Sequence, residues 1–132
     1  MTIKTYCMTE TAENHFWKAL HESKQKWGHK RAAKYRVDFL KGLQHIAESH
    51  QTFNSPHREE LSEGTEFSIH LVEHRYVAFQ EYDKNTIIIV GIFHENMDIS
   101  TRLKELQSMA QQEIEVLKRD IERTQNKKSL KK

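Results

Sequence analysis

The sequence predicts an α+β fold of order β-α-α-β-β-β, in which a helical hairpin packs on a small antiparallel sheet and an extra C-terminal helix follows. Three observations predict it. The run Ile87–Phe93 is apolar and mostly β-branched, which is typical of a central strand covered on both faces. Two stretches before residue 50 carry apolar residues at steps of three and four, the spacing of amphipathic helices. The same spacing returns after Asp98.

Length and composition indicate one weakly basic domain. The chain has 132 residues and a net charge of +2, so a phosphate-coated partner is not implied by overall charge and needs a local argument. Cys7 is the single cysteine, which excludes an internal disulfide and fits a reducing compartment. The first ten residues contain no apolar run of the kind found in signal peptides, and Ile87–Phe93 is too short to cross a bilayer. We therefore expect a cytoplasmic protein with no membrane contact.

The N-terminal half is expected to form a strand and two helices. Residues Ile3–Met8 alternate in the manner of a strand that pairs at one side of a sheet. Thr9 or Thr11 can cap the helix that follows, and Gly28 is a natural end for it. In the first helix, the face predicted to be buried consists of Ala12, Phe16, Ala19, Leu20, Ser23 and Trp27. The second helix is expected to begin at Lys30, and its buried face consists of Ala32, Tyr35, Phe39, Leu43, Ile46 and Ala47.

Gly42 interrupts the second helix, where glycine costs about 1 kcal/mol relative to alanine. It marks either a close approach to a neighbouring element or a surface position of no consequence. The segment from His50 to Gly64 has no period and holds the only proline, Pro56, so a surface loop is expected there. Alternation over Phe67–Val72 predicts the next strand.

The segment His74–Asp98 is predicted to be a β-hairpin. Arg75 to Tyr82 alternate between two faces, and the turn-prone Asp83-Lys84-Asn85 connects this strand to the apolar run.

The residues after the hairpin are expected to form one long helix capped by Ser100. Its apolar seam is narrow and consists of Leu103, Leu106, Ala110, Ile114, Leu117 and Ile121. The seam either packs back on the sheet or the helical hairpin, or serves as a docking surface for a partner or a second copy of the chain. On the second interpretation Leu103, Leu106, Ile114, Leu117 and Ile121 bind a partner, and a homodimer forms through this helix.

The end of the last strand resembles a known family. Ile92-Phe93-His94, running into Glu95-Asn96-Met97-Asp98, is similar to the final hairpin of the RelE/ParE superfamily of toxin–antitoxin toxins, which commonly closes in an "ILH…MD" pattern. The "Ala…Trp-Gly…Ala…Tyr" run at Ala12, Trp27-Gly28, Ala33 and Tyr35 is also similar. The resemblance covers about residues 3–104, and compact family members end soon after the last strand. It implies a toxin domain at residues 1–99 and a C-terminal helical extension with a basic tail at residues 100–132.

Two activities are attached to this superfamily. ParE-like members inhibit DNA gyrase by protein–protein contact, whereas RelE-like members cut messenger RNA on the ribosome. Both are neutralised by a cognate antitoxin, which usually wraps the toxin with an amphipathic segment that folds on binding. The hairpin His74–Asp98 resembles the ParE type more closely, so the resemblance implies growth arrest through gyrase. A ribonuclease and a non-toxic relative that only binds a partner stay open. The groove between the helical hairpin and the sheet is the first expected antitoxin site, and the C-terminal seam is the second.

A ribonuclease needs a base, an acid and cations for the charge that develops on the phosphorane. The residues that best meet this demand are Arg75, His94 and Glu95. His94 otherwise ends its strand, and Arg75 otherwise pairs with Glu73 or Glu81. Lysine and arginine are sparse on the strands Phe67–Val72 and Arg75–Tyr82, where ribonuclease members place several, and this shortage favours the gyrase interpretation.

The sequence contains no motif for a metal or a cofactor. Of its nine histidines, His70 and His74 share strand parity, yet one pair does not complete a coordination sphere. There is no glycine-rich phosphate loop, Ser-His-Asp arrangement or nucleotide fingerprint. The aromatic residues Tyr35, Phe39, Tyr76 and Phe79 are interpreted as core and rim, because a base-stacking platform needs interleaved cations. We expect neither a metal nor a cofactor.

Overall fold

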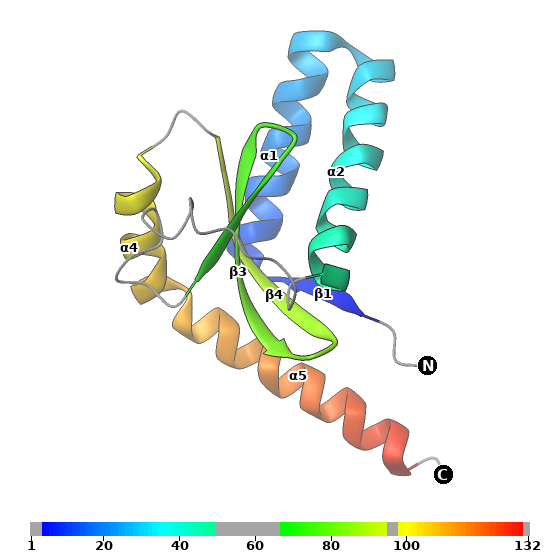
Figure 1. The fold of residues 1–132 in the computed structure, drawn as a ribbon, viewed down its shortest axis with the longest axis vertical. Helices are drawn as coiled ribbons and strands as arrows, with labels where there is room; N and C mark the ends of the chain where they lie inside the picture. The colour runs from blue at the N-terminus through cyan, green and yellow to red at the C-terminus, as the bar shows by residue number, and fades with distance from the viewer. Residues whose placement is uncertain (1–3, 50–66, 95–97, 131–132) are drawn as a thin grey trace.

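The computed structural model describes residues 4–49, 67–94 and 98–130, so the expected loop His50–Gly64 and the candidate Glu95 lie outside the described residues. The elements in chain order are β1 (Thr5–Met8), α1 (Glu10–Trp27), α2 (His29–Ser49), β2 (Ser68–Val72), β3 (Arg75–Asp83), β4 (Thr86–His94), α4 (Ile99–Met109) and α5 (Gln111–Leu130). The fold is α+β, and the predicted order β-α-α-β-β-β is confirmed (Figure 1).

The four strands form one sheet in the order β1-β4-β3-β2. Pairs β2–β3 and β3–β4 are antiparallel hairpins, and the side chain of Asp83 accepts from the N–H of Asn85 in the second turn. Strand β1 pairs parallel to β4, with Thr5 opposite Thr86 and Met8 opposite Ile89. The prediction of an antiparallel sheet was therefore wrong in this pair. The chain that leads from β1 to the other strands contains both helices of the hairpin, and a connection of that length permits parallel pairing.

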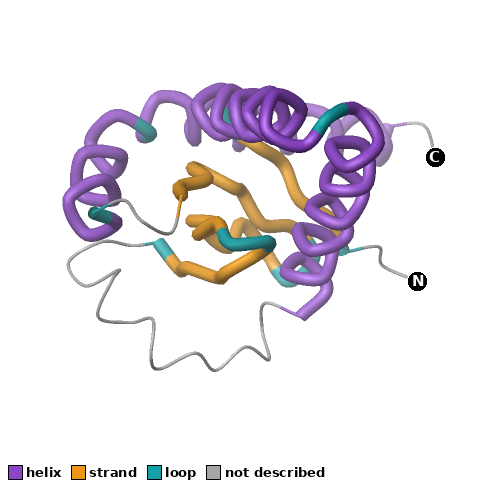
Figure 2. Tube along the Cα trace, turned by 90° about the horizontal axis from the view of Figure 1, so that it is seen from above, coloured by secondary structure: helices purple, strands orange, loops and turns teal. Residues whose placement is uncertain are grey.

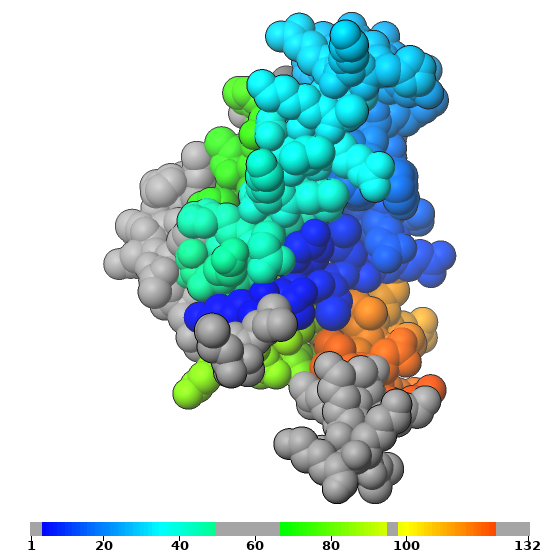
Figure 3. All heavy atoms as spheres, turned by 90° about the vertical axis from the view of Figure 1, so that its right-hand side faces the viewer, coloured from blue at the N-terminus to red at the C-terminus, as the bar shows by residue number. Residues whose placement is uncertain are grey.

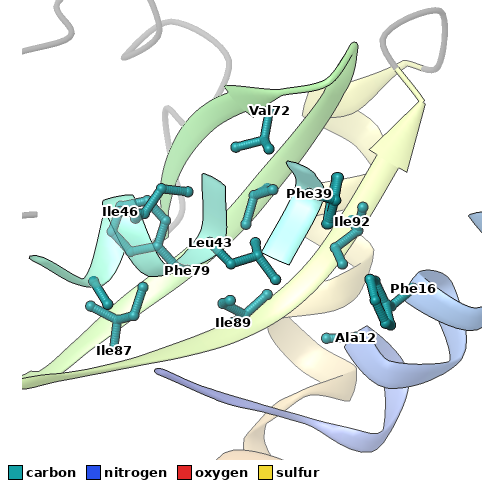
Figure 4. Packing of buried hydrophobic residues seen from close by; sticks show 12 residues of the cluster. Ala12, Phe16, Phe39, Leu43, Ile46, Val72, Phe79, Ile87, Ile89 and Ile92 are labelled. Carbon is teal, nitrogen blue, oxygen red and sulfur yellow. The ribbon is translucent and has the colours of Figure 1, made fainter. Parts of the chain in front are cut away.

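Helices α1 and α2 pack side by side on one face of the sheet (Figures 1 and 2). Thr9 caps α1, because its hydroxyl accepts from the N–H of Ala12, and Gly28 ends the helix with a φ of 85°. Figure 4 shows the contact layer, in which side chains from the two helices point onto β3 and β4. The buried residues of this layer are Ala12, Phe16, Phe39, Leu43, Ile46, Ala47, Val72, Val77, Phe79, Ile87, Ile89 and Ile92.

The C-terminal segment covers the other face of the sheet, as Figure 2 shows. It forms two helices instead of the one expected, with a bend at the fully buried Ala110 that keeps both halves of the seam on the twisted sheet. Asp98 caps α4, in place of the expected Ser100, by accepting from the N–H of Thr101. The buried residues on this side are Phe67, Ile69, Ala78, Ile88, Val90, Phe93, Ile99, Leu103, Leu106, Ala110 and Ile114. The extension thus completes the second core of the fold.

A bulge in β4 determines which side chains face each layer. Ala78 pairs with Gly91 while Phe79 pairs with Ile89, so Val90 is the extra residue. Before the bulge, odd-numbered residues of β4 face the helical hairpin, whereas after it Ile92 faces the hairpin and Phe93 faces α4. The strand is buried on both faces, as its uniform composition predicted.

No described helix combines the length and the hydrophobicity that crossing a membrane requires.

Candidate functional site

A pocket of about 380 Å³ opens where the closed end of the helical hairpin meets the ends of the strands. Its walls are the last turns of α1, the first turns of α2, the turn between β2 and β3, and the end of β4. The lining residues are Glu22, Ser23, Lys26, Trp27, Arg31, Lys34, Tyr35, Asp38, Glu73, His74, Arg75 and His94. Figure 3 shows the closed end of the hairpin as the top of the molecule, so the pocket lies near an exposed extremity.

Arg75 is held at the base of this pocket by two contacts. Its Nε donates to the hydroxyl of Tyr35 over 3.0 Å, and its Nη2 donates to the carboxylate of Glu22 over 3.2 Å. The Arg75 side chain is 16% exposed, whereas the Glu22 side chain is 49% exposed. The cation is therefore a fixed part of the fold, while its carboxylate partner lies at the surface. Glu73 or Glu81 was expected as the partner of Arg75, whereas the structure shows a pairing with Glu22, 53 residues earlier in the chain.

Tyr35 supports the arginine from the helix side. Its ring stacks on Phe39, with centroids 5.8 Å apart, and lies 6.4 Å from the ring of Trp27. Burial raises the pKa of the Tyr35 hydroxyl, an effect that the donated hydrogen bond from Arg75 opposes. The hydroxyl stays protonated at neutral pH, so it can accept from Arg75 and still donate its own proton.

Trp27 forms the outer rim. It belongs to the face of α1 predicted to be buried, yet it is 45% exposed, because it lies at the end of the helix beyond the sheet. The ammonium of Lys26 lies 5.3 Å and the guanidinium of Arg31 lies 5.8 Å from its ring centroid. Such cation–π contacts keep both cations close to the pocket mouth.

Ser23 provides a polar atom inside the wall. The residue is 4% exposed, and its Oγ has no hydrogen-bond partner among the described residues. A buried hydroxyl without a partner is costly to the fold, and such groups are few in native structures. Ser23 also lines the pocket, but its Oγ is itself closed off from solvent, so a ligand can become its partner only after a small shift of the wall.

The pocket brings two of the three candidate catalytic residues together. Arg75 and His94 are directly opposite each other in the β3–β4 pair, and both line the pocket. Its formal charges are mixed: four cations, Lys26, Arg31, Lys34 and Arg75, face three carboxylates, Glu22, Asp38 and Glu73. The arrangement is suited to holding one anionic group, since it leaves a single excess positive charge.

The residues predicted to bind a partner lie elsewhere. Leu103, Leu106 and Ile114 are at most 4% exposed in the core under α4 and α5, Leu117 is partly buried against that core, and Ile121 is half-buried. Packing on the sheet, one of the two alternatives for this seam, is what the structure shows. The first expected antitoxin groove, between the helical hairpin and the sheet, is filled by side chains such as Phe39 and Leu43 except at the pocket.

Sequence reasoning missed Glu22, Ser23, Lys26 and Lys34 as pocket residues. A signal was present, because polar and charged residues gather in α1 and α2 at the end of each helix nearest Gly28. It could not be interpreted without knowing which strand end lies beneath them. In the described part of the chain, no three histidine, cysteine or acidic side chains gather as a metal site would require.

Comparison of the sequence with protein-family models gave no match, and comparison with curated proteins gave none.

Proposed function

We propose that this chain is the toxin component of a type II toxin–antitoxin system of the ParE type. In this proposal it arrests growth by inhibiting DNA gyrase through protein–protein contact, and a cognate antitoxin neutralises it. The observation that carries the proposal is the fold. A helical hairpin, whose first helix ends at Trp27-Gly28, packs on a sheet whose last two strands form the β3–β4 hairpin and end at His94. The order of these elements is the one that the RelE/ParE resemblance implies.

The state of the sheet supports a contact mechanism over RNA cleavage. Helices cover both of its faces, α1 and α2 on one side and α4 and α5 on the other, so among the described residues the sheet offers little open surface to RNA. Arg75 is the one lysine or arginine within the four described strands, and Glu22 compensates its charge. A ribonuclease needs several uncompensated cations around the scissile phosphate. Inhibition by contact has no such requirement.

One observation favours the second candidate, a ribosome-dependent mRNA endoribonuclease of the RelE type. Arg75 and His94 face the same pocket from adjacent strands, and this is the kind of pairing that general acid–base catalysis at a phosphate uses.

Replacement of His94 by alanine separates the two candidates. We expect His94→Ala to arrest growth as fully as the matched control His21→Ala, whose histidine is exposed on α1. We also expect the purified wild-type chain and both variants to inhibit DNA supercoiling by gyrase to the same degree. A folded His94→Ala protein that no longer arrests growth would replace the gyrase proposal with the ribonuclease. A chain that neither arrests growth nor inhibits gyrase is a non-toxic relative.

A further inference from the structure

We propose that the pocket around Arg75 binds a carboxylate side chain of the antitoxin, and that Glu22 holds this place in the free protein. The inference rests on the proposed function for the identity of the partner. It rests on the pocket itself for the chemistry that the partner presents.

The Arg75–Glu22 contact has the form of an exchangeable pair. The Arg75 side chain is mostly enclosed and its guanidinium is held by Tyr35, so it is already oriented for a carboxylate. The Glu22 carboxylate contacts Nη2 over 3.2 Å, and its side chain is half exposed. The Glu22 side chain is half exposed, so its carboxylate returns to water easily, and Arg75 is not left unpaired when another carboxylate replaces it. A carboxylate brought by a partner can therefore take the position of Glu22 with a small penalty.

Ser23 is a second, independent indication of a ligand. Its Oγ is buried in the wall of the same pocket and has no partner among the described residues. A hydroxyl can donate to a carboxylate oxygen, so a small shift of the wall that exposes this Oγ would let it donate to a ligand bound at Arg75. The Tyr35 hydroxyl, which accepts from Arg75, has its own proton to donate to the same ligand.

The charge distribution directs an acidic partner to this end of the molecule. Residues 18–36 contain seven lysines and arginines and one acidic residue, Glu22, although the whole chain has a net charge of only +2. These residues form the closed end of the helical hairpin, which is the top of the molecule in Figures 1 and 3. A local concentration of one sign of charge accelerates association with a partner of the opposite sign.

The composition of the pocket favours a protein carboxylate over a nucleic acid. Glu22, Asp38 and Glu73 line the pocket together with the cations, and a chain of phosphates would be repelled by them. The ring of Trp27, the one exposed aromatic surface of the rim, is already flanked by Lys26 and Arg31. A base would have to displace these cations to stack there, whereas a single carboxylate would not.

The test uses the purified full chain and two fluorescein-labelled peptides in a fluorescence anisotropy titration. In one peptide glutamate alternates with leucine, and in the other glutamine replaces every glutamate. We expect the glutamate peptide to bind and the glutamine peptide to bind at least about tenfold more weakly, since a charge-assisted hydrogen bond is worth about that factor. Labelled oligouridine is the third probe. Tighter binding of oligouridine than of the glutamate peptide would overturn the proposal in favour of a nucleic-acid surface.

Two variants and a control localise the binding. Arg75→Gln should weaken the glutamate peptide about tenfold. Glu22→Gln should strengthen it several-fold, because the competing carboxylate is gone. Lys41→Gln removes one positive charge from an exposed position of α2 that does not line the pocket, so it should have a small effect. An Arg75→Gln effect equal to that of Lys41→Gln would overturn the proposal, and so would a Glu22→Gln variant with unchanged affinity. The Glu22 variant leaves Arg75 in place, so the test does not depend on Arg75→Gln folding.

Failure of this inference is distinguishable from failure of the proposed function. Binding of the peptides is measured without gyrase or cells. A chain that does not arrest growth and still selects the glutamate peptide through Arg75 overturns the toxin proposal and supports the carboxylate pocket. A chain that inhibits gyrase and binds both peptides equally supports the toxin proposal and overturns the carboxylate pocket.

Discussion

Gly42 lies where α2 closely approaches strand β2. A Cβ atom built on it would collide with Cγ1 of Val72 in β2. The sequence left two interpretations of this glycine open, a close approach or a surface position of no consequence, because helical periodicity does not reveal what crosses a helix. The structure shows the close approach.

We therefore expect Gly42→Ala to lower the free energy of unfolding by about 1–3 kcal/mol, the usual cost of overpacking, despite the higher helix propensity of alanine. Urea unfolding followed by circular dichroism measures this. Val72→Ala removes the obstructing methyl groups, so the double variant should be destabilised less than the sum of the two single variants. A Gly42→Ala protein about 1 kcal/mol more stable than the wild type would show that the helix and strand do not touch here.

Arg75 shows the limit of sequence reasoning for single residues. Its position at the start of a strand and its value as an anion-binding group were predictable from residue type and alternation. Its partners were not, because Tyr35 and Glu22 precede it by 40 and 53 residues. Contacts at such separations depend on how α1 and α2 cross the sheet, which no local pattern specifies. Ser23 was expected in the buried face of its helix, but its lack of a partner becomes visible only in three dimensions.

Helix α1 completes the edge of strand β4 where strand β1 ends. Strand β1 pairs with β4 only as far as Ile89. Beyond it, the N–H of Ile92 donates to Nδ1 of His15 over 3.1 Å, and the His15 ring lies 5.2 Å from that of Phe93. The imidazole must be unprotonated at Nδ1 to accept. Burial and the nearby Lys18 lower the pKa of His15, against the opposing influence of Glu113.

This contact predicts a dependence of stability on pH. Because folding lowers the pKa of His15, the unfolded chain binds more protons below about pH 6.5, so stability falls as pH falls from there through the lower folded pKa. His15→Asn places a non-titrating amide oxygen near the position of Nδ1. Urea unfolding at several pH values should show that the wild type loses more stability on acidification than this variant does. Equal losses in the two proteins would contradict the role assigned to His15.

Several features of the elements were predictable, and others were not. The central strand, the β3–β4 turn and the buried faces of α1 and α2 follow from local periodicity and turn residues. The parallel pairing of β1, the bulge at Val90 and the bend at Ala110 do not, because each depends on matching segments that are distant in sequence. The position of α5 is another feature that local sequence patterns do not predict. The carboxylate of Glu113 accepts from both the N–H and the hydroxyl of Thr11, 2.8 Å away in each case, and so joins α5 to the first turn of α1.

The whole molecule is a covered sheet with a basic end. Two layers of helices occupy the faces of the sheet, so within the described residues recognition is left to the helical surfaces and the pocket at the closed end of the hairpin. The fold class could be predicted from sequence, since periodicity and element order determine it. The location of the candidate site could not, because the C-terminal seam that looked available for a partner is needed to bury the second face. We therefore propose that recognition takes place at the hairpin end, and that the proposed toxin activity works by protein–protein contact.

Pulse-labelling of DNA and protein synthesis in bacteria, within minutes of inducing this chain alone, tests that account most directly. A gyrase inhibitor halts replication before translation, so we predict that incorporation of labelled thymidine falls first while incorporation of labelled methionine continues. If methionine incorporation falls first, the chain acts on the ribosome, and Arg75 and His94 become the candidate active site of a ribonuclease, which contradicts the proposed mechanism.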